Sequence, residues 1–205
     1  DGKPTASLIH FWPGNALRIQ AKEPLVADAW QHITITYDGS SRAAGLKLFL
    51  DGEPLDTVVI ADHLTSGITD WIKIKDDSHR LHIVFGQRYR DRGCKKGQLD
   101  EFHAFDRELT AAEARQLFDG KHLAQLLAKD HTALTGADRS ALFDYFIATT
   151  SAEARKIRQE LRIARATWNQ QMDVLPTVSI MRELPEPKPA FVLDRGAYDA
   201  LGEPV

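Results

Sequence analysis

The first hundred residues of the chain alternate between hydrophobic and polar positions, in short runs that turn residues separate. In residues 30–37, Ile33, Ile35 and Tyr37 fall on one side of the alternation and the polar residues between them on the other. A period of two is typical of a β-strand with one buried face, because successive side chains point to opposite sides. We therefore expect a strand here, with Ile33, Ile35 and Tyr37 directed inward.

Turn signals follow this strand at regular intervals. The pair Asp38-Gly39 opens a turn, residues 45–50 form a second run, and Asp51-Gly52 turns the chain again before a third run at residues 56–60. Asp-Gly pairs are typical of tight turns between antiparallel strands, since glycine adopts positive φ without steric cost. The spacing predicts a β-meander, with further strands at residues 72–74, 81–85 and 98–105.

After residue 105 the hydrophobic period lengthens from two toward about 3.6, which is typical of amphipathic helices. Thr110 and Glu113 have the spacing of a capping box, and Gly120 is placed to end the helix that they begin. A second helix is expected at residues 121–129 and a third at residues 138–148. These signals predict a helical extension behind the β-rich part.

The longest predicted helix follows Thr150 and Glu153, which are spaced as another capping box. Apolar residues then recur at intervals of three and four: Ala154, Ile157, Leu161, Ala164 and Trp168. So narrow a stripe is typical of a helix that packs against one partner helix. The outward positions are more basic than acidic, which favours a solvated face, with a nucleic-acid site as the alternative.

The overall composition is that of a protein able to bury a core, with 43% hydrophobic and 27% charged residues. The formal net charge of −3 argues against general attraction to nucleic acid or an anionic membrane. No apolar run approaches the roughly 20 residues of a membrane helix, so no membrane span is expected. Cys94 is the one cysteine, which excludes disulfides and cysteine-based metal sites within the chain.

Residues 30–39, 45–52 and 97–109 together resemble the laminin-G-like, concanavalin A-like jelly roll. Residues 8–17, 182–187 and 195–199 resemble a narrower family, the large planctomycete-type proteins that join a cytochrome-c-like region, a laminin-G-like domain and a conserved C-terminal domain. This resemblance implies an extracytoplasmic setting, in the periplasm or at the cell surface. It also implies that haem belongs to other parts of the parent protein, since no Cys-x-x-Cys-His occurs here and no cofactor is expected in this segment.

The predicted fold class is mainly β. It consists of an antiparallel concanavalin A-like β-sandwich over residues 1–109, an α-helical extension over residues 110–175, and an extended proline-rich tail over residues 176–205 that leads into a further domain. The resemblance implies that the opening strands of the sandwich are missing. We expect a preceding polypeptide segment to be the partner that completes it, because half a sandwich exposes strand edges and apolar faces.

The densest cluster of candidate binding residues lies in residues 87–96. It comprises Arg88, Tyr89, Arg90 and Arg92, with Trp71 as a second stacking surface. Guanidinium groups match sulfate, carboxylate or phosphate, and a tyrosine ring can stack on a sugar. The cluster therefore predicts a site for an anionic polysaccharide, with a solvated turn as the alternative. Trp12 and Trp30 are expected to pack rather than bind.

Catalytic and metal-binding residues are not expected in the sandwich. Glucanases of this class carry paired carboxylates on one strand face, but the comparable strand has Gln98 in the leading position, and Glu101 faces away from Asp100. Asp100 is expected to accept hydrogen bonds from a turn, with a structural calcium site as the alternative. His79 and His82 are three residues apart, which puts them on opposite faces of a strand and disfavours a metal site.

These observations predict a non-catalytic module that binds carbohydrate or protein and assembles a larger extracytoplasmic multidomain protein. A glycan, in particular an anionic polysaccharide, is the expected ligand, and nucleic acid is not. The first alternative is a purely structural spacer that positions redox or catalytic domains. A polysaccharide-acting enzyme is the second, and the missing carboxylate pair argues against it.

Overall fold

The computed structural model describes residues 2–68, 83, 85–86, 97–176, 178, 180, 189–193 and 200–205. The chain forms two compact units, Asp1–Val174 and Leu175–Val205. The first unit holds two three-stranded antiparallel sheets and four helices, all within the described residues. The fold class is therefore mixed α and β, and the prediction of a mainly β protein was wrong in its proportions.

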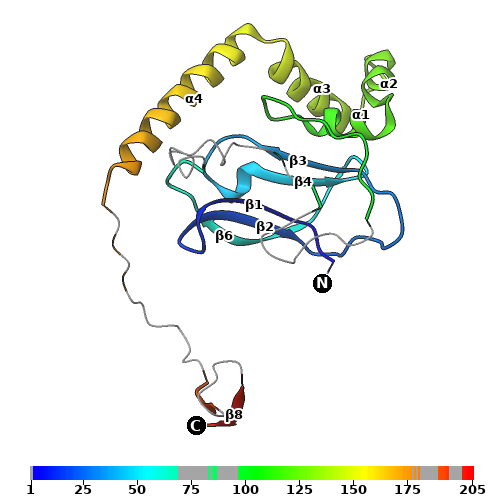
Figure 1. The fold of residues 1–205 in the computed structure, drawn as a ribbon. Helices are drawn as coiled ribbons and strands as arrows, with labels where there is room; N and C mark the ends of the chain where they lie inside the picture. Colours follow the sequence, from blue (N-terminus) through cyan, green and yellow to red (C-terminus); the bar gives the residue numbers. More distant parts are fainter. Residues whose placement is uncertain are drawn as a thin grey trace. The chain divides into compact units, whose positions relative to one another are not determined.

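The first sheet has the strand order β1-β2-β6, formed by β1 (Thr5–Phe11), β2 (Asn15–Ala21) and β6 (Thr57–His63). Both neighbours pair with β2 in the antiparallel sense. As the central strand, β2 is the most deeply buried, and Leu17 and Ile19 are almost fully enclosed. This sheet forms one layer of the sandwich (Figure 1).

The second sheet has the order β3-β4-β5, formed by β3 (Ile33–Tyr37), β4 (Leu46–Leu50) and β5 (Glu53–Pro54). A short 3-10 helix, η1 (Ala43–Gly45), leads into β4. Between the two sheets lies the hydrophobic core, made of Ala6, Ile19, Ala43, Leu46 and Leu48. The predicted pairing of the first two runs is confirmed, since β3 and β4 are antiparallel neighbours. The predicted meander was wrong for its third run, because residues 57–63 form β6 and pair with β2 in the other sheet.

The face predicted for the three apolar residues of β3 is confirmed, but two of them are not buried there. Tyr37 packs against the core, but Ile33 and Ile35 are 42% and 56% exposed. The register pairs them with Leu50 and Leu48, so they do lie on the face that the core occupies. Among the described strands, β3 is at the end of its sheet.

The opposite face of the same sheet is the better covered one at β3. Thr34 and Thr36 are buried there, beside Phe49 on the paired strand. Lys47 on this face binds Glu108, with Nζ and Oε1 3.0 Å apart, and Figure 1 shows α1 and α3 lying over β3 and β4. The helical extension therefore acts as a third layer that the period-two pattern did not reveal.

Residues 98–105 form no strand, so the strand predicted there was wrong. Glu101 has a φ of 50°, which interrupts an extended backbone, and Phe102 and Phe105 are about half exposed. The strands expected at residues 72–74 and, for the most part, at residues 81–85 lie outside the described residues. Their pairing stays a prediction.

The four helices are α1 (Ala111–Asp119), α2 (His122–Ala128), α3 (Gly136–Thr149) and α4 (Ala152–Asp173). The capping box of Thr110 and Glu113 is confirmed, and Gly120 ends α1 in the left-handed conformation. The capping box predicted at Thr150 was wrong by one residue, because Ser151 is the N-cap and accepts a hydrogen bond from the amide of Ala154. Among the described residues, no helix is both long and apolar enough to cross a membrane.

The second unit contains a small antiparallel pair of strands, β7 (Phe191–Leu193) and β8 (Leu201–Pro204). The sequence predicted an extended, proline-rich tail here and no regular helix. Prolines exclude a regular helix but leave strand ends open to pairing, and Pro204 lies at the end of β8 opposite Phe191. The tail thus has a local fold of its own.

Candidate functional site

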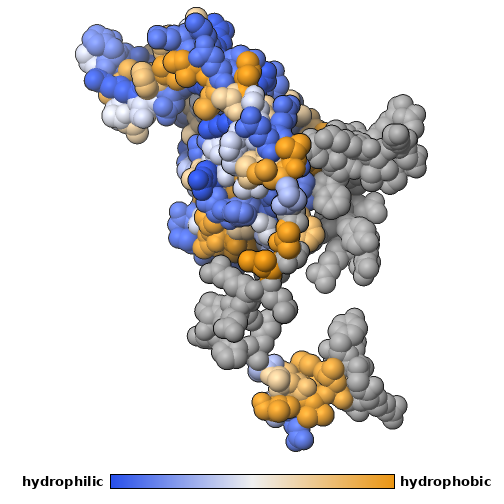
Figure 2. Space-filling model, turned by 90° about the vertical axis from the view of Figure 1, so that its left-hand side faces the viewer, coloured by the Kyte–Doolittle hydropathy of each residue, from blue (hydrophilic) through white to orange (hydrophobic). Residues whose placement is uncertain are grey.

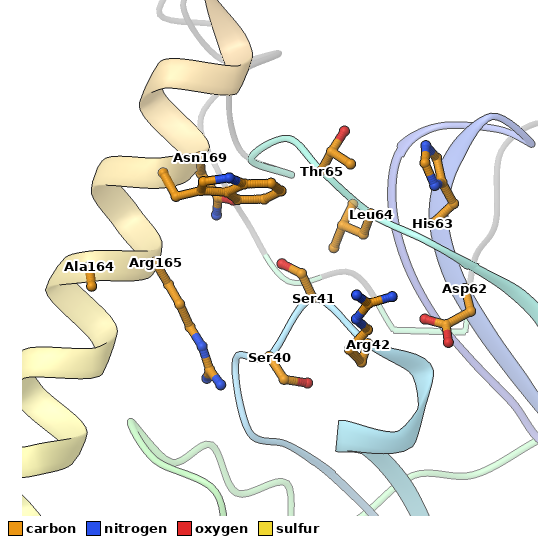
Figure 3. A pocket seen from close by; sticks show the side chains of 11 residues that line it. Ser40, Ser41, Arg42, Asp62, His63, Leu64, Thr65, Ala164, Arg165 and Asn169 are labelled. Carbon is orange, nitrogen blue, oxygen red and sulfur yellow. The ribbon is translucent and has the colours of Figure 1, made fainter.

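A pocket of about 510 Å³ opens between the sandwich and α4, both of which belong to the first unit. Its lining residues are Ser40, Ser41, Arg42, Asp62, His63, Leu64, Thr65, Ala164, Arg165, Trp168 and Asn169. They come from the loop after β3, from the end of β6 and its following residues, and from the second half of α4 (Figure 3). Three segments distant in sequence therefore share one cavity.

The loop after β3 is fixed by hydrogen bonds from its backbone. The amide of Ser40 donates to Asp38 Oδ1 at 2.8 Å, and the amide of Ser41 donates to the Tyr37 hydroxyl at 2.7 Å. Gly45 packs directly beneath, where an added Cβ would collide with the side chains of Asp38 and Ser40. These contacts hold the neighbouring Arg42 at the rim of the pocket.

The end of β6 supplies the second part of the wall. Asp62 accepts a hydrogen bond from the amide of Ala43 at 2.7 Å, which ties β6 to η1. Thr65 is clamped by Asn15, whose Oδ1 accepts from the Thr65 amide at 2.8 Å and whose Nδ2 donates to its hydroxyl at 2.9 Å. The wall is therefore built on the rigid sheet rather than on a free loop.

Helix α4 supplies the third part through one face of its helix. Ala164, Arg165, Trp168 and Asn169 are spaced at intervals of one, three and one, which brings them to the same side. Arg165 Nη1 donates to the carbonyl oxygen of Asp38 at 3.0 Å, and Figure 3 shows its side chain reaching from α4 toward the loop of Ser40. Trp168 is 45% exposed, so part of its indole surface is open to solvent.

The polar groups of the pocket are only partly used by the protein itself. Among the described residues, neither Arg42 nor Arg165 forms an ion pair, although two guanidinium groups and the Asp62 carboxylate line the same cavity. Ser40 Oγ and Asn169 Oδ1, on facing walls, are buried without a hydrogen-bond partner. An open indole surface with several unused donors can hold a polar ligand that also has an apolar face.

The predicted ligand-binding residues Arg88, Tyr89, Arg90, Arg92 and Trp71 lie outside the described residues, as do His79, His82 and Cys94. Their roles stay predictions. Asp100 is described: its Oδ1 accepts a hydrogen bond from the amide of Glu101 at 2.8 Å. The part of the chain that the structure describes contains no cluster of three metal-binding side chains, and the calcium alternative for Asp100 also stays a prediction.

Two other tryptophans depart from their predicted packing role. Trp30 is 68% exposed, so the prediction that it packs was wrong. Trp12 packs partly, with the Arg18 guanidinium 4.3 Å from its ring centroid. Trp30 lies three residues before β3, close in sequence to the exposed Ile33 and Ile35.

Sequence reasoning missed the pocket because it assigned its residues to other roles. The pattern predicts Trp168 as the end of a stripe for a partner helix, and it predicts the basic residues at the outward positions, which include Arg165, as a solvated face. The available signal was the combination of Arg165, Trp168 and Asn169 on one helix side. That combination is unusual for a helix contact, since contact stripes avoid amide and guanidinium groups.

The comparisons with known proteins concern mainly the sandwich. The sequence profile of a family described as the concanavalin A-like lectin/glucanases superfamily matches residues 4–115, more than half of the 205 residues. A solved structure of an S-layer domain-containing protein from Clostridium thermocellum is 15% identical with a TM-score of 0.32, over 58% of this chain and 64% of that chain. The match thus spans less than two thirds of that structure, and no argument rests on it.

No curated protein matches the chain. Neither match supports the planctomycete-type, cytochrome-c-associated context.

Proposed function

This chain belongs to the concanavalin A-like lectin/glucanases superfamily, and on that premise we propose that it is a carbohydrate-binding module whose ligand occupies the pocket between the sandwich and α4. The single observation that carries the proposal is the lining of that pocket. An exposed indole faces a cavity whose other walls offer hydroxyl, amide, imidazole and guanidinium groups. Sugars present apolar ring faces bordered by hydroxyl groups, which such a lining complements.

We propose that binding at this pocket is not accompanied by hydrolysis. Glycoside hydrolysis ordinarily uses two carboxyl groups, one on each side of the scissile bond. Asp62 is the one carboxylate among the described residues of the lining, and one of its oxygens already accepts a hydrogen bond from the Ala43 amide. This composition supports a binding role in preference to a catalytic one.

The proposal also covers the larger protein in which this module acts. We propose that the module serves assembly within a larger extracytoplasmic protein, and that a preceding polypeptide segment covers the exposed Ile33 and Ile35 of β3. The exposure of these two side chains on the core face supports the second part. The cytochrome-c-associated context rests on the resemblance of residues 8–17, 182–187 and 195–199 alone.

Affinity electrophoresis of the full chain through gels that contain neutral and acidic polysaccharides tests the proposal. At least one polysaccharide is expected to retard the protein. Trp168→Ala should weaken that binding about tenfold or more, because truncation of a central tryptophan commonly costs more than 1 kcal/mol of binding free energy. The matched control is Trp30→Ala, which removes an exposed indole outside the pocket. Retardation by no polysaccharide, or an equal loss in both variants, contradicts the proposal.

A further inference from the structure

We propose that the pocket selects an acidic sugar unit, one that carries a carboxylate or a sulfate, and that this unit bridges the sandwich and α4. The inference rests on the proposed carbohydrate-binding function and adds the ligand class and the consequence of binding. Its basis is the placement of Arg42 on the sandwich wall and Arg165 on the α4 wall of one cavity.

The charges of the pocket favour an anion. Among the described lining residues, the two guanidinium groups and the one carboxylate sum to a formal excess of one positive charge. Asp62 does not cancel this excess locally, since it directs one oxygen to the Ala43 amide and forms no ion pair with either arginine. An anionic group entering the cavity therefore meets cations that no described acidic side chain has already paired.

The two arginines still have donors to offer. Arg165 donates from one terminal nitrogen, Nη1, to the carbonyl oxygen of Asp38. The other N–H groups of its planar guanidinium group can still donate to a ligand. Arg42 is exposed, and its side chain has no hydrogen bond to the described residues. Guanidinium forks bind carboxylate and sulfate oxygens through paired hydrogen bonds, which are about twice as strong as neutral ones.

Binding across this cavity also joins two parts of the first unit that touch sparsely. None of the residues of α4 is buried, and Arg165 Nη1 donates a hydrogen bond across this boundary to the Asp38 carbonyl oxygen. Figure 2 shows that hydrophobic side chains on this side of the molecule lie in separate patches among hydrophilic ones. A ligand held by Arg42 and Arg165 together would add the contacts that packing does not provide.

Isothermal titration of the full chain with three probes of equal length tests the selectivity: a galacturonate trimer, a sulfated galactose trimer and a neutral galactose trimer. We expect one or both acidic probes to bind about tenfold more tightly than the neutral one, and the tighter of the two identifies the anionic group. Arg42→Ala should abolish this preference, because it should weaken the binding of the acidic probes by a larger factor than that of the neutral probe. Arg42→Lys should keep part of it, since the charge remains and the fork is lost.

The control for general electrostatic attraction is Arg155→Ala, which removes a cation of α4 outside the pocket lining. This variant should retain the preference for the acidic probe. Hydrogen exchange provides the second measurement: the amides of residues 161–169 should exchange more slowly with the acidic probe bound than with the neutral probe bound.

Equal affinity for the acidic and neutral probes overturns this inference, and Trp168-dependent binding of both would leave the proposed function standing. An equal loss in Arg155→Ala and Arg42→Ala also overturns it, because diffuse charge would then explain the preference. Unchanged exchange in α4 overturns the bridging. If no trimer binds and no polysaccharide retards the protein, the proposed function itself fails.

Discussion

Helices α1 and α4 begin in the same way and end in very different surroundings. Both start at a hydroxyl N-cap that accepts a hydrogen bond from a backbone amide. The nine-residue α1 buries three residues, whereas none of the 22 residues of α4 is buried. Local sequence therefore determines that each helix forms, but it does not determine whether the helix becomes part of the core.

Small side chains and one ion pair account for the docking of α1. Ala112 and Ala114 are buried, and Glu113 between them binds Arg107 through hydrogen bonds of 2.5 and 3.0 Å. At Gly52, in the turn after β4, an added Cβ would lie 2.8 Å from the Arg115 Cα. The sheet therefore meets the backbone of α1 itself, whereas α4 presents longer side chains that keep its backbone away.

The largest contrast should come from truncating one leucine in each region. Leu48→Ala should lower the free energy of unfolding by about 2–5 kcal/mol, because it opens a cavity in the core between the sheets. Leu161→Ala should cost less than about 1 kcal/mol, since its side chain is 44% exposed on α4. Urea denaturation followed by near-ultraviolet circular dichroism measures both. Equal losses would mean that α4 is packed as tightly as the core.

A smaller effect should come from the ion pair that anchors α1. Glu113→Gln should lower the free energy of unfolding by about 1–2 kcal/mol, because it removes the charge that Arg107 and the Thr110 amide share. Burial by itself raises the pKa of Glu113, but the hydrogen bonds from Arg107 and Thr110 bring the pKa below its ordinary value of 4.5.

Because the folded-state pKa is the lower one, the contribution of Glu113 is complete above pH 4.5 and is lost as the pH falls through the folded-state pKa. The stability difference between the wild type and Glu113→Gln should therefore shrink when urea denaturation is repeated in acid. A difference that stays constant with pH would show that the charge of Glu113 is not what anchors the helix.

The smallest effect should appear where α4 begins. Arg158 donates from Nη1 to the carbonyl oxygen of Ala148 at 3.0 Å and from Nη2 to that of Ile147 at 2.9 Å, at the end of α3. Arg158→Ala should cost about 0.5–1 kcal/mol, because cations near a helix C-terminus stabilise its last carbonyls by roughly that amount. Faster hydrogen exchange at the end of α3, with the exchange of α1 unchanged, is the expected readout. Arg162→Ala is the matched control on the same helix.

Much of the local structure could be predicted because it depends on neighbouring residues. The turn at Asp51-Gly52, the capping box of Thr110 and the end of α1 at Gly120 each follow from backbone preferences that act over a few positions. The capping box expected at Thr150 failed by one residue because Ser151 competes for the same role. The spacing of residues does not predict which of two adjacent hydroxyl residues becomes the N-cap.

The candidate site could not be predicted because it depends on which segments meet. Period-two alternation placed Ile33 and Ile35 on the correct face, but it carried no information on how much of each side chain other segments would cover there. Likewise, nothing in the order of residues indicates that Arg42 and Arg165 line one cavity. The alternation of residue types determines to which face of the strand a side chain points. Only the tertiary arrangement determines which residues of other segments lie close to it.

The hydrogen bonds from Arg158 to the end of α3 fix the first part of α4, so a change at this junction would tilt the rest of the helix about that point. The ten residues from Arg158 to Trp168 span about 15 Å at the rise of an α-helix, so a tilt of about 4° at the pivot displaces the indole by about 1 Å. Substitutions at the junction of the two helices would thus widen or narrow the aperture without altering any residue that lines it. If related proteins bind ligands of different size, we expect sequence differences at the junction of α3 and α4 as well as among the residues that line the pocket.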